Sequence, residues 1–364
     1  MEQLTFFEEL GKFNPNLRVH ESKDWKWSFN DYPASKGIKV FSCFACGGGS
    51  TMGYKLAGCE VIGDLEIDPK VNDIYVANHN PKYNYCMDIR DFNNQVLLPR
   101  ELFSLDILDG SPPCTTFSLA GDREDTWGKS KKFREGQKEQ TLDDLSFHFI
   151  ETAKILQPKV VIMENVEGLL LGAALKYAQK IYDDFSLAGY DVRHYILKGE
   201  ALGVPQKRHR VFFVGVRKDL QFNYDLLDMN FNYKPVLFGE VRSPAGKKPN
   251  GKLIQKRLSY VREGDHSIAD AMKRVEGRNV DFNTCINWDN EVAFTLRARE
   301  TIATAIRGYD KQCLSDQDII NISTFPQDYN FMDQKPNYIC GMSVPPIMIK
   351  RLVTRIIDTG IFNK

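Results

Sequence analysis

The feature that most constrains the fold of this sequence is a regular alternation of short apolar runs and longer amphipathic stretches, which begins at Gly37. The runs GIKVFSCFA, EVIGDLEID, YNYCMDI, FSLDILDG, KVVIMEN and RVFFVGV have the length of buried strands, and stretches such as DPKVNDIYVANH have the pattern of helices. Strands that alternate with helices predict an α/β fold with a doubly wound sheet. Ligands of such sheets bind beyond the carboxyl ends of the strands, so the residues after each run are the first candidates for a functional site.

The alternation stops at about Asp219, and the charge pattern changes with it. Between Lys234 and Arg278 there are eleven Lys and Arg residues against five Asp and Glu, in a chain whose formal net charge is zero. Local clustering of this kind attracts polyanions even when the bulk charge does not. We therefore predict a small inserted domain. The predicted boundaries are 1–36 for an N-terminal extension, 37–218 for the main domain, 219–297 for the inserted domain and 298–364 for a closing segment that returns to the main domain.

Composition excludes several classes of protein. The eight cysteines include one Cys-x-x-Cys pair, Cys43 and Cys46, but no second pair at the spacing of a zinc site. We expect neither a metal site nor a disulfide framework. The sequence has no signal peptide and no apolar run near the ~18 residues of a membrane span. These features predict a soluble, cytoplasmic protein that does not contact a membrane.

A glycine-rich segment, FSCFACGGGSTMG, follows the first run and opens a predicted helix, where a nucleotide-like cofactor meets backbone amides. Gly47, Gly48 and Gly49 are adjacent, which does not fit the Gly-x-Gly-x-x-Gly spacing of a dinucleotide site. Glu66 ends the second run, where an acid can hold ribose hydroxyls. Asp88 ends the third, where it can accept from an adenine amino group. Together these residues favour S-adenosylmethionine over NAD and disfavour a dehydrogenase.

A second constellation begins at Cys114, which follows two prolines in DGSPPCTTFS. Two prolines hold the next side chain in a narrow range of directions, although an incidental cysteine in a strand-ending turn fits these ten residues equally well. Glu164 and Asn165 end the next run, and Arg208 and Arg210 lie two apart on one face of an extended segment. A thiolate that adds to carbon 6 of a pyrimidine makes carbon 5 nucleophilic, and the addition needs an acid and hydrogen-bond donors at the ring.

Ordered motifs make the chain resemble the bacterial and phage 5-methylcytosine DNA methyltransferases from about Gly37 to its end. The matching stretches are FACGGGSTMG, Glu66, MDI, SPPCTTFSLAG, ENVEGL, QKRHR, LSDQDIINISTFPQDY and GMSVPP. The resemblance implies a Rossmann-like sheet with a smaller inserted target recognition domain. It also implies methyl transfer from S-adenosyl-L-methionine to carbon 5 of a cytosine in a specific short double-stranded DNA sequence. The reaction would pass through a covalent cysteine adduct on a flipped-out base.

The resemblance assigns a role to each motif residue. Cys114 would be the nucleophile, Glu164 the acid at the cytosine ring, Arg208 and Arg210 the donors at its exocyclic oxygen, and Asn165 the brace of the loop around Cys114. The residues implied to line the S-adenosylmethionine pocket are Phe44, Cys46, Gly47, Gly48, Gly49, Glu66, Ile67, Asp88, Ile89, Pro113 and Leu145. Simple core positions for Phe44 and Ile89, and a structural ion pair for Arg208, remain as alternatives.

Two positions depart from the family pattern. Cys46 stands where the family has its first glycine, and Met342 stands where GNSVPP has asparagine. A tRNA cytosine-5 methyltransferase of the same fold is the alternative function, and the basic inserted segment favours DNA. The implied setting is a restriction-modification system or phage-borne protection. The expected partners are double-stranded DNA and a cognate restriction endonuclease, with a monomer acting on nucleoid DNA.

Overall fold

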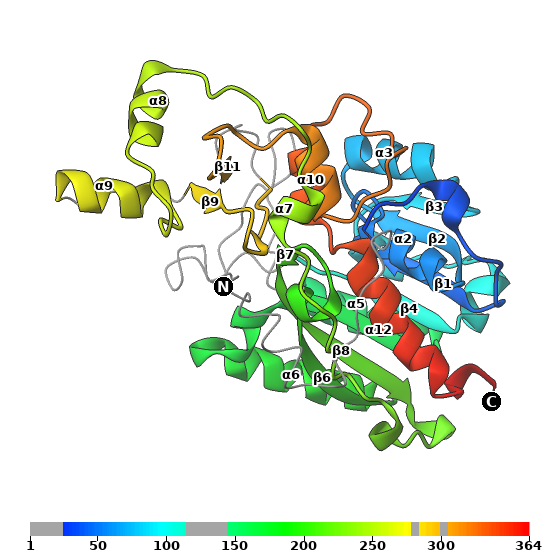
Figure 1. Ribbon diagram of the computed structural model, residues 1–364. Coiled ribbons are helices and arrows are strands. Elements are labelled where there is room, and N and C mark those ends of the chain that lie inside the picture. The colour runs from blue at the N-terminus through cyan, green and yellow to red at the C-terminus, as the bar shows by residue number, and fades with distance from the viewer. Residues whose placement is uncertain (1–24, 114–143, 278–283, 299–304, 364) are drawn as a thin grey trace. The chain divides into compact units, whose positions relative to one another are not determined.

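The computed structural model describes residues 25–113, 144–277, 284–298 and 305–363. By their internal contacts these residues form two compact units, and many of their elements are labelled in Figure 1. The first unit lies within Met1–Asp31, Lys198–Arg208 and Asn230–Ile349, and the second lies within Tyr32–Leu197, His209–Met229 and Lys350–Lys364.

A seven-stranded sheet is the centre of the second unit. Its strands are β1 (Lys39–Cys43), β2 (Glu60–Glu66), β3 (Tyr83–Cys86), β4 (Ile107–Gly110), β5 (Val160–Val166), β6 (Tyr190–Lys198) and β8 (His209–Arg217). They lie in the order β3-β2-β1-β4-β5-β8-β6. The pairs β3–β2, β2–β1, β1–β4 and β4–β5 are parallel, whereas β8 runs antiparallel to β5. The predicted α/β fold with a Rossmann-like, mostly parallel sheet is confirmed.

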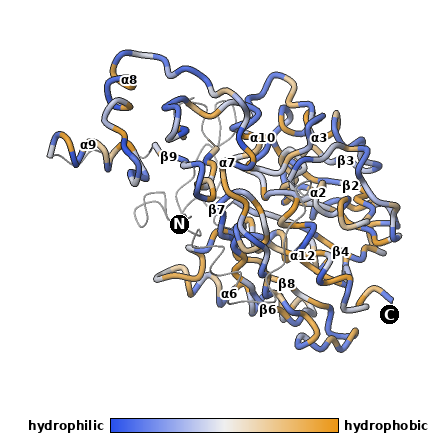
Figure 2. The backbone as a smooth tube through the Cα atoms, viewed as in Figure 1, coloured by the Kyte–Doolittle hydropathy of each residue, from blue (hydrophilic) through white to orange (hydrophobic). Residues whose placement is uncertain are grey.

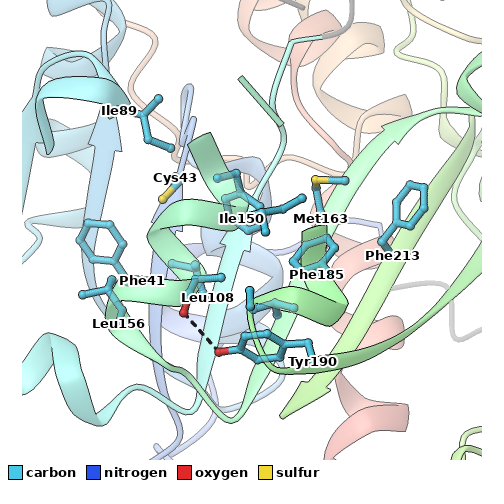
Figure 3. Close-up of a cluster of buried hydrophobic side chains, with 14 of the residues drawn as sticks. Phe41, Cys43, Ile89, Leu108, Ile150, Leu156, Met163, Phe185, Tyr190 and Phe213 are labelled. Atoms are coloured by element: carbon cyan, nitrogen blue, oxygen red, sulfur yellow. Dashed lines mark hydrogen bonds between the residues drawn. The ribbon is translucent and has the colours of Figure 1, made fainter. Parts of the chain in front are cut away.

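The apolar runs form strands because their side chains are buried together in the sheet. The parallel register sets Phe41 opposite Leu108, and Leu108 opposite Val161, so three neighbouring strands place apolar side chains side by side. Figure 3 shows Phe41 and Leu108 with Met163 and Phe213 in one buried cluster. Full burial of one such side chain stabilises the fold by about 1.5–3 kcal/mol, so this cluster fixes the strands that carry the site.

Helices connect the strands, and their boundaries follow local signals in the sequence. The helices of this unit are α2 (Gly49–Leu56), α3 (Pro69–His79), α4 (Ile89–Asn93), α5 (Leu145–Leu156), α6 (Leu175–Leu187) and, from Lys350 onward, α12 (Pro346–Asp358). At α3, the Asp68 carboxylate accepts from the backbone N–H groups of Lys70 and Val71, and Pro69 occupies the first turn. An acidic cap followed by proline is a favourable helix start, so α3 begins directly after β2.

The first unit has little sheet and a separate small core. Its elements are β7 (Gln206–Lys207), α7 (Phe238–Val241), α8 (Lys252–Ser259), α9 (Ile268–Glu276), β9 (Cys285–Asn287), β10 (Ala293–Phe294), β11 (Ala305–Arg307), α10 (Asp316–Ile322) and α11 (Pro336–Met342). The pairs β7–β10 and β9–β11 are parallel. The small core consists of Leu258, Val261, Ile268, Ala271, Met272, Ile286, Ile306 and Cys313.

Residues 25–31 of the predicted N-terminal extension pack within this first unit, whereas residues 32–36 belong to the second. The indole of Trp27 is buried and donates to the carbonyl of Thr324 at 2.8 Å. The backbone N–H of Phe29 donates to the carboxylate of Asp328. Across the parts of the chain that the structure describes, none of the helices combines the length and the apolar character that crossing a membrane requires.

Candidate active site

The backbone that leads to Cys114 is fixed to the end of β5, although Cys114 itself lies outside the described residues. Asn165, which is 2% exposed, donates from Nδ2 to the carbonyl of Pro112 at 3.4 Å. Its Oδ1 accepts from the backbone N–H of Val166 at 2.8 Å. Both ends of the Asn165 amide are therefore occupied, and Pro112 is held two positions before the cysteine.

Glu164 and Arg210 form an ion pair on adjacent antiparallel strands. The register sets Glu164 opposite Phe212 and Val166 opposite Arg210, so the two charged residues are diagonal neighbours on one face. Arg210 Nε lies 2.8 Å from Glu164 Oε1, and the side chains are 16% and 11% exposed. Removing one partner of such a shielded pair would leave the other charge uncompensated. The fold thus places an acid and a guanidinium together at the end of β5.

Arg208 has a different environment from Arg210. It lies between the end of β7 and the start of β8, so the continuous extended segment expected through both arginines is interrupted there. Its side chain is 3% exposed and donates to the carbonyls of Leu296 (3.3 Å), Gly341 (3.2 Å) and Met342 (3.5 Å). These acceptors all belong to the first unit, whereas Arg210 belongs to the second. Arg208 connects the stretch 294–298, FTLRA, to the GMSVPP motif of its own unit.

The loop between β1 and α2 is held in an unusual conformation by the end of β2. Glu66 accepts from the backbone N–H of Cys46 and from that of Asp68, both at 2.9 Å. Burial raises the pKa of Glu66 above its ordinary value, and these N–H donors act in the opposite direction. Phe44 and Cys46 have φ of 55° and 48°, the left-handed region that favours glycine. Cys46 therefore keeps the backbone conformation suited to the glycine that it replaces.

Gly48 is required at the start of α2 for two reasons. Its φ is 83°, and a Cβ at this position would lie 2.0 Å from Nε2 of His79. The His79 ring is buried, and its Nε2 lies 3.3 Å from the carbonyl oxygen of Gly47. Burial, with a smaller effect of Lys55, lowers the pKa of His79 to about 3, so the ring is neutral. Nothing in the sequence pattern around His79 indicates this contact.

The other residues predicted for the cofactor pocket divide by burial. Asp88 caps α4 by accepting from the N–H of Arg90 at 2.9 Å, and it forms an ion pair with the guanidinium of Arg90 at 3.0 Å. Ile89 and Leu145 belong to the buried core cluster, and Phe44 packs against it. Ile67 and Pro113 are partly exposed. The strand ends thus carry a mixture of core side chains and accessible polar groups.

The sequence prediction did not include Asp109, a carboxyl group buried at the end of β4. It is 2% exposed, and it accepts from Ser42 Oγ at 2.8 Å and from the Tyr54 hydroxyl at 3.0 Å. Burial raises its pKa to about 7, and the charge of Glu164 acts in the same direction. The available signal was an acid inside the apolar run FSLDILDG. This network joins β1, α2 and β4 through Ser42, Tyr54 and Asp109.

Comparisons of sequence point to one family. The model of the family described as C-5 cytosine-specific DNA methylase matches residues 38–358. The Type II methyltransferase M.HindV of Haemophilus influenzae is 27% identical over 328 residues, which cover 88% of this chain and 97% of that protein. The Type II methyltransferase M.FnuDI of Fusobacterium nucleatum is 34% identical over 189 residues, about half of each chain (51% of this one and 49% of the relative).

Solved structures share the fold at lower sequence identity. A putative DNA modification methyltransferase encoded within an E. coli prophage matches with a TM-score of 0.67 and 18% identity, covering 90% of this chain and all (100%) of that one. A mutant of Spodoptera frugiperda DNMT2 matches with a TM-score of 0.60 and 14% identity, covering 88% and 100%. At these identities the likeness establishes the fold alone.

Proposed function

The chain belongs to the C-5 cytosine-specific DNA methylase family and is a DNA (cytosine-5)-methyltransferase akin to those of Type II restriction-modification systems. From this premise we propose the steps by which it methylates its target cytosine. The target cytosine lies in a specific short double-stranded sequence and flips out of the duplex. Cys114 then adds to carbon 6 of the flipped cytosine. The adduct is needed because carbon 5 of an aromatic pyrimidine is a poor nucleophile until the ring becomes an enamine. Flipping is needed because a thiolate cannot reach carbon 6 inside the base stack.

The observation that carries this proposal is the Glu164–Arg210 ion pair beside the Asn165 brace. As the thiolate adds, electron density moves toward ring nitrogen 3 and the exocyclic oxygen. We assign Glu164, after its carboxylate has taken up a proton from solvent, to pass that proton to the nitrogen, and Arg210 to donate a hydrogen bond to the oxygen. Because the ion pair fixes both groups before the base arrives, little reorganisation is needed during the reaction. For Arg208, the carbonyl contacts support a positioning role that connects Leu296 to the GMSVPP motif.

S-adenosylmethionine would supply the methyl group, and the residues after β1, β2 and β3 fit its adenosine portion. Glu66 uses only part of its capacity on the N–H groups of Cys46 and Asp68, because a carboxylate has about four lone-pair sites. Ribose hydroxyls can therefore donate to it without releasing the loop. The residues that complete the proposed pocket are Phe44, Gly47, Gly48, Gly49, Ile67, Asp88, Ile89, Pro113 and Leu145.

The basic segment, 219–297, is the part of the chain to which we assign the choice of DNA sequence. Within it, residues 234–278 hold eleven Lys and Arg against five Asp and Glu. This local excess suits the phosphate backbone, whose neutralisation supplies most of the affinity of a DNA-binding protein. The proposed partners are double-stranded DNA, which a single chain modifies, and a cognate restriction endonuclease. In a host or a prophage, the methylated sites would be protected from that nuclease.

Methylation mapping tests this function. The full chain and its Cys114→Ser variant are expressed in a bacterial host without cytosine methylation, and 5-methylcytosine is mapped in DNA and in tRNA. We expect one short DNA sequence to be methylated by the wild-type chain and none by the variant. Methylation confined to tRNA, or a fully active serine variant, would contradict the proposal.

A further inference from the structure

The helix α8 has an apolar face and a polar face. Ile254 and Leu258 lie one turn apart on α8 and, with Val261 just beyond the end of the helix, pack in the small core of the first unit, where α8 contacts α9. Because residues three and four apart share one side of a helix, Lys252, Gln255, Lys256 and Ser259 lie on the side away from Ile254 and Leu258. Leu253, which is 62% exposed, lies beside them. The inner side of α8 is therefore fixed by packing, and its outer side is free to bind.

The outer face of α8 consists of Lys252, Gln255, Lys256 and Ser259, all of them exposed. These positions are i, i+3, i+4 and i+7, so they form one continuous strip along the helix. The stretch 247–259, KKPNGKLIQKRLS, contains five basic residues and no acidic one. Figure 2 shows the hydrophilic backbone that leads into α8. The strip thus combines two lysines with an amide and a hydroxyl.

Some other basic residues of this unit are already paired with carboxylates. Arg242 lies 3.0 Å from Asp289, and Lys247 lies 2.6 Å from Asp316. These pairs belong to the fold of the unit itself. In contrast, within the described parts of the chain, no carboxylate lies within the 4.0 Å of an ion pair from the ammonium group of Lys252 or Lys256.

The neighbouring helix α9 has a mixed surface. It exposes Asp270 and Glu276 as well as Lys273, and Arg274 lies 2.6 Å from Asp265. Asp270 also caps the helix together with Ser267. Opposite charges on α9 offset one another, so the positive potential of this helix pair is concentrated on the outer face of α8.

We infer that the outer face of α8 enters the major groove of the substrate DNA, with Lys252 and Lys256 on phosphates and Gln255 at a base edge. This inference rests on the proposed function. An eight-residue helix is about 12 Å long and 10–12 Å wide, and the major groove is about 12 Å wide. Gln255 donates from Nε2 to the carbonyl of Pro249 at 3.3 Å, which directs the amide and leaves Oε1 as an acceptor. In this groove the acceptor recognises the exocyclic amino group of adenine or cytosine.

The phosphate contacts are tested by the salt dependence of DNA binding. Lys252→Gln/Lys256→Gln should weaken binding of the full chain to duplex DNA roughly 10- to 60-fold at 0.1 M salt. It should also lower the slope of log K against log salt by about two, because each lost phosphate contact contributes about 0.9. Lys273→Gln on α9 is the matched control and should keep the wild-type slope. Equal slopes in the double variant and the control would overturn the inference.

The base contact is tested by mapping methylated sites. The Gln255→Ala variant should methylate the wild-type target sequence and also sequences that differ from it at one adenine or cytosine position. Discrimination at that position should fall roughly 5- to 100-fold, and discrimination at the other positions should stay unchanged. A motif unchanged at every position would refute the assignment of Gln255. If the wild-type chain methylated no DNA, the proposed function would fail, but the salt slopes would still decide whether α8 contacts phosphates.

Discussion

At the scale of single residues, the least expected group is Asp109, a carboxyl whose folded-state pKa is about 7 against an ordinary value of 3.8. Below about pH 4 both the folded and the unfolded chain hold its proton, so the group does not affect the free energy of unfolding. Between about pH 4 and 7 the unfolded state releases the proton first, and the free energy of unfolding falls. Above about pH 7 this decrease in the free energy of unfolding is complete, and it amounts to at most roughly 4 kcal/mol.

The first prediction is that Asp109→Asn removes this part of the pH dependence. The asparagine has no proton to release and can keep hydrogen bonds to Tyr54 and Ser42, since the serine hydroxyl can turn to accept. Urea unfolding at pH 5 and pH 8 measures the difference. Asp183→Asn, an exposed position on α6, serves as the control with wild-type dependence. If Asp109→Asn left the dependence unchanged, the buried network would not control this titration.

The second prediction concerns Glu66, which both shapes the loop and is assigned to the ribose. Glu66→Ala removes the acceptor of two backbone N–H groups as well as the proposed ribose contact. We expect S-adenosylmethionine binding to weaken by roughly 1.5–3 kcal/mol, the scale of hydrogen bonds to a charged group. DNA affinity without the cofactor should be unchanged. Calorimetry that finds full cofactor affinity in Glu66→Ala would leave this carboxylate with a structural role only.

At the scale of elements, the sequence predicts the strands better than their directions. The runs around Val40, Ile62 and Val161 become β1, β2 and β5 because strands buried on both faces are continuously apolar. The run RVFFVGV carries no signal of direction, so the antiparallel course of β8 could not be predicted. The interruption at Arg208 was missed for a similar reason, because alternation of side chains applies only within an unbroken strand.

The third prediction belongs to the element formed by the β1 loop and α2. Gly48→Ala meets both an unfavourable φ and the ring of His79, so it should lower the free energy of unfolding by roughly 2–4 kcal/mol. Gly37→Ala is the control, since its φ is 72° but nothing lies within 4 Å of the added Cβ. It should lower the free energy of unfolding only by the contribution of the unfavourable φ. Adding His79→Ala to Gly48→Ala should reduce the combined loss below the sum of the two single losses. Strict additivity would show that the ring does not limit this position.

At the scale of the whole molecule, the sequence motifs were enough to predict the family. Which side chains of the site contact one another could be seen only in the structure. Glu164, Asn165 and Arg210 were expected to act in one site. The Glu164–Arg210 contact follows from the antiparallel register of β5 and β8. The Asn165–Pro112 contact joins β5 to the residues after its parallel neighbour β4. Among the cations of the inserted segment, only the structure separates the lysines of α8 from those already paired, because the partners are distant in sequence.

The central claim is that Cys114 attacks the target cytosine, and trapping the adduct tests it most directly. The full chain is incubated with S-adenosylmethionine and a duplex that carries 5-fluorocytosine at the methylated position, and the mixture is separated under denaturing conditions. Fluorine blocks the final elimination, so we expect a stable protein–DNA adduct whose DNA-bearing peptide contains Cys114, and no adduct with Cys114→Ser. An adduct formed equally by the serine variant, or none formed by a wild-type chain that methylates the same site, would contradict the account.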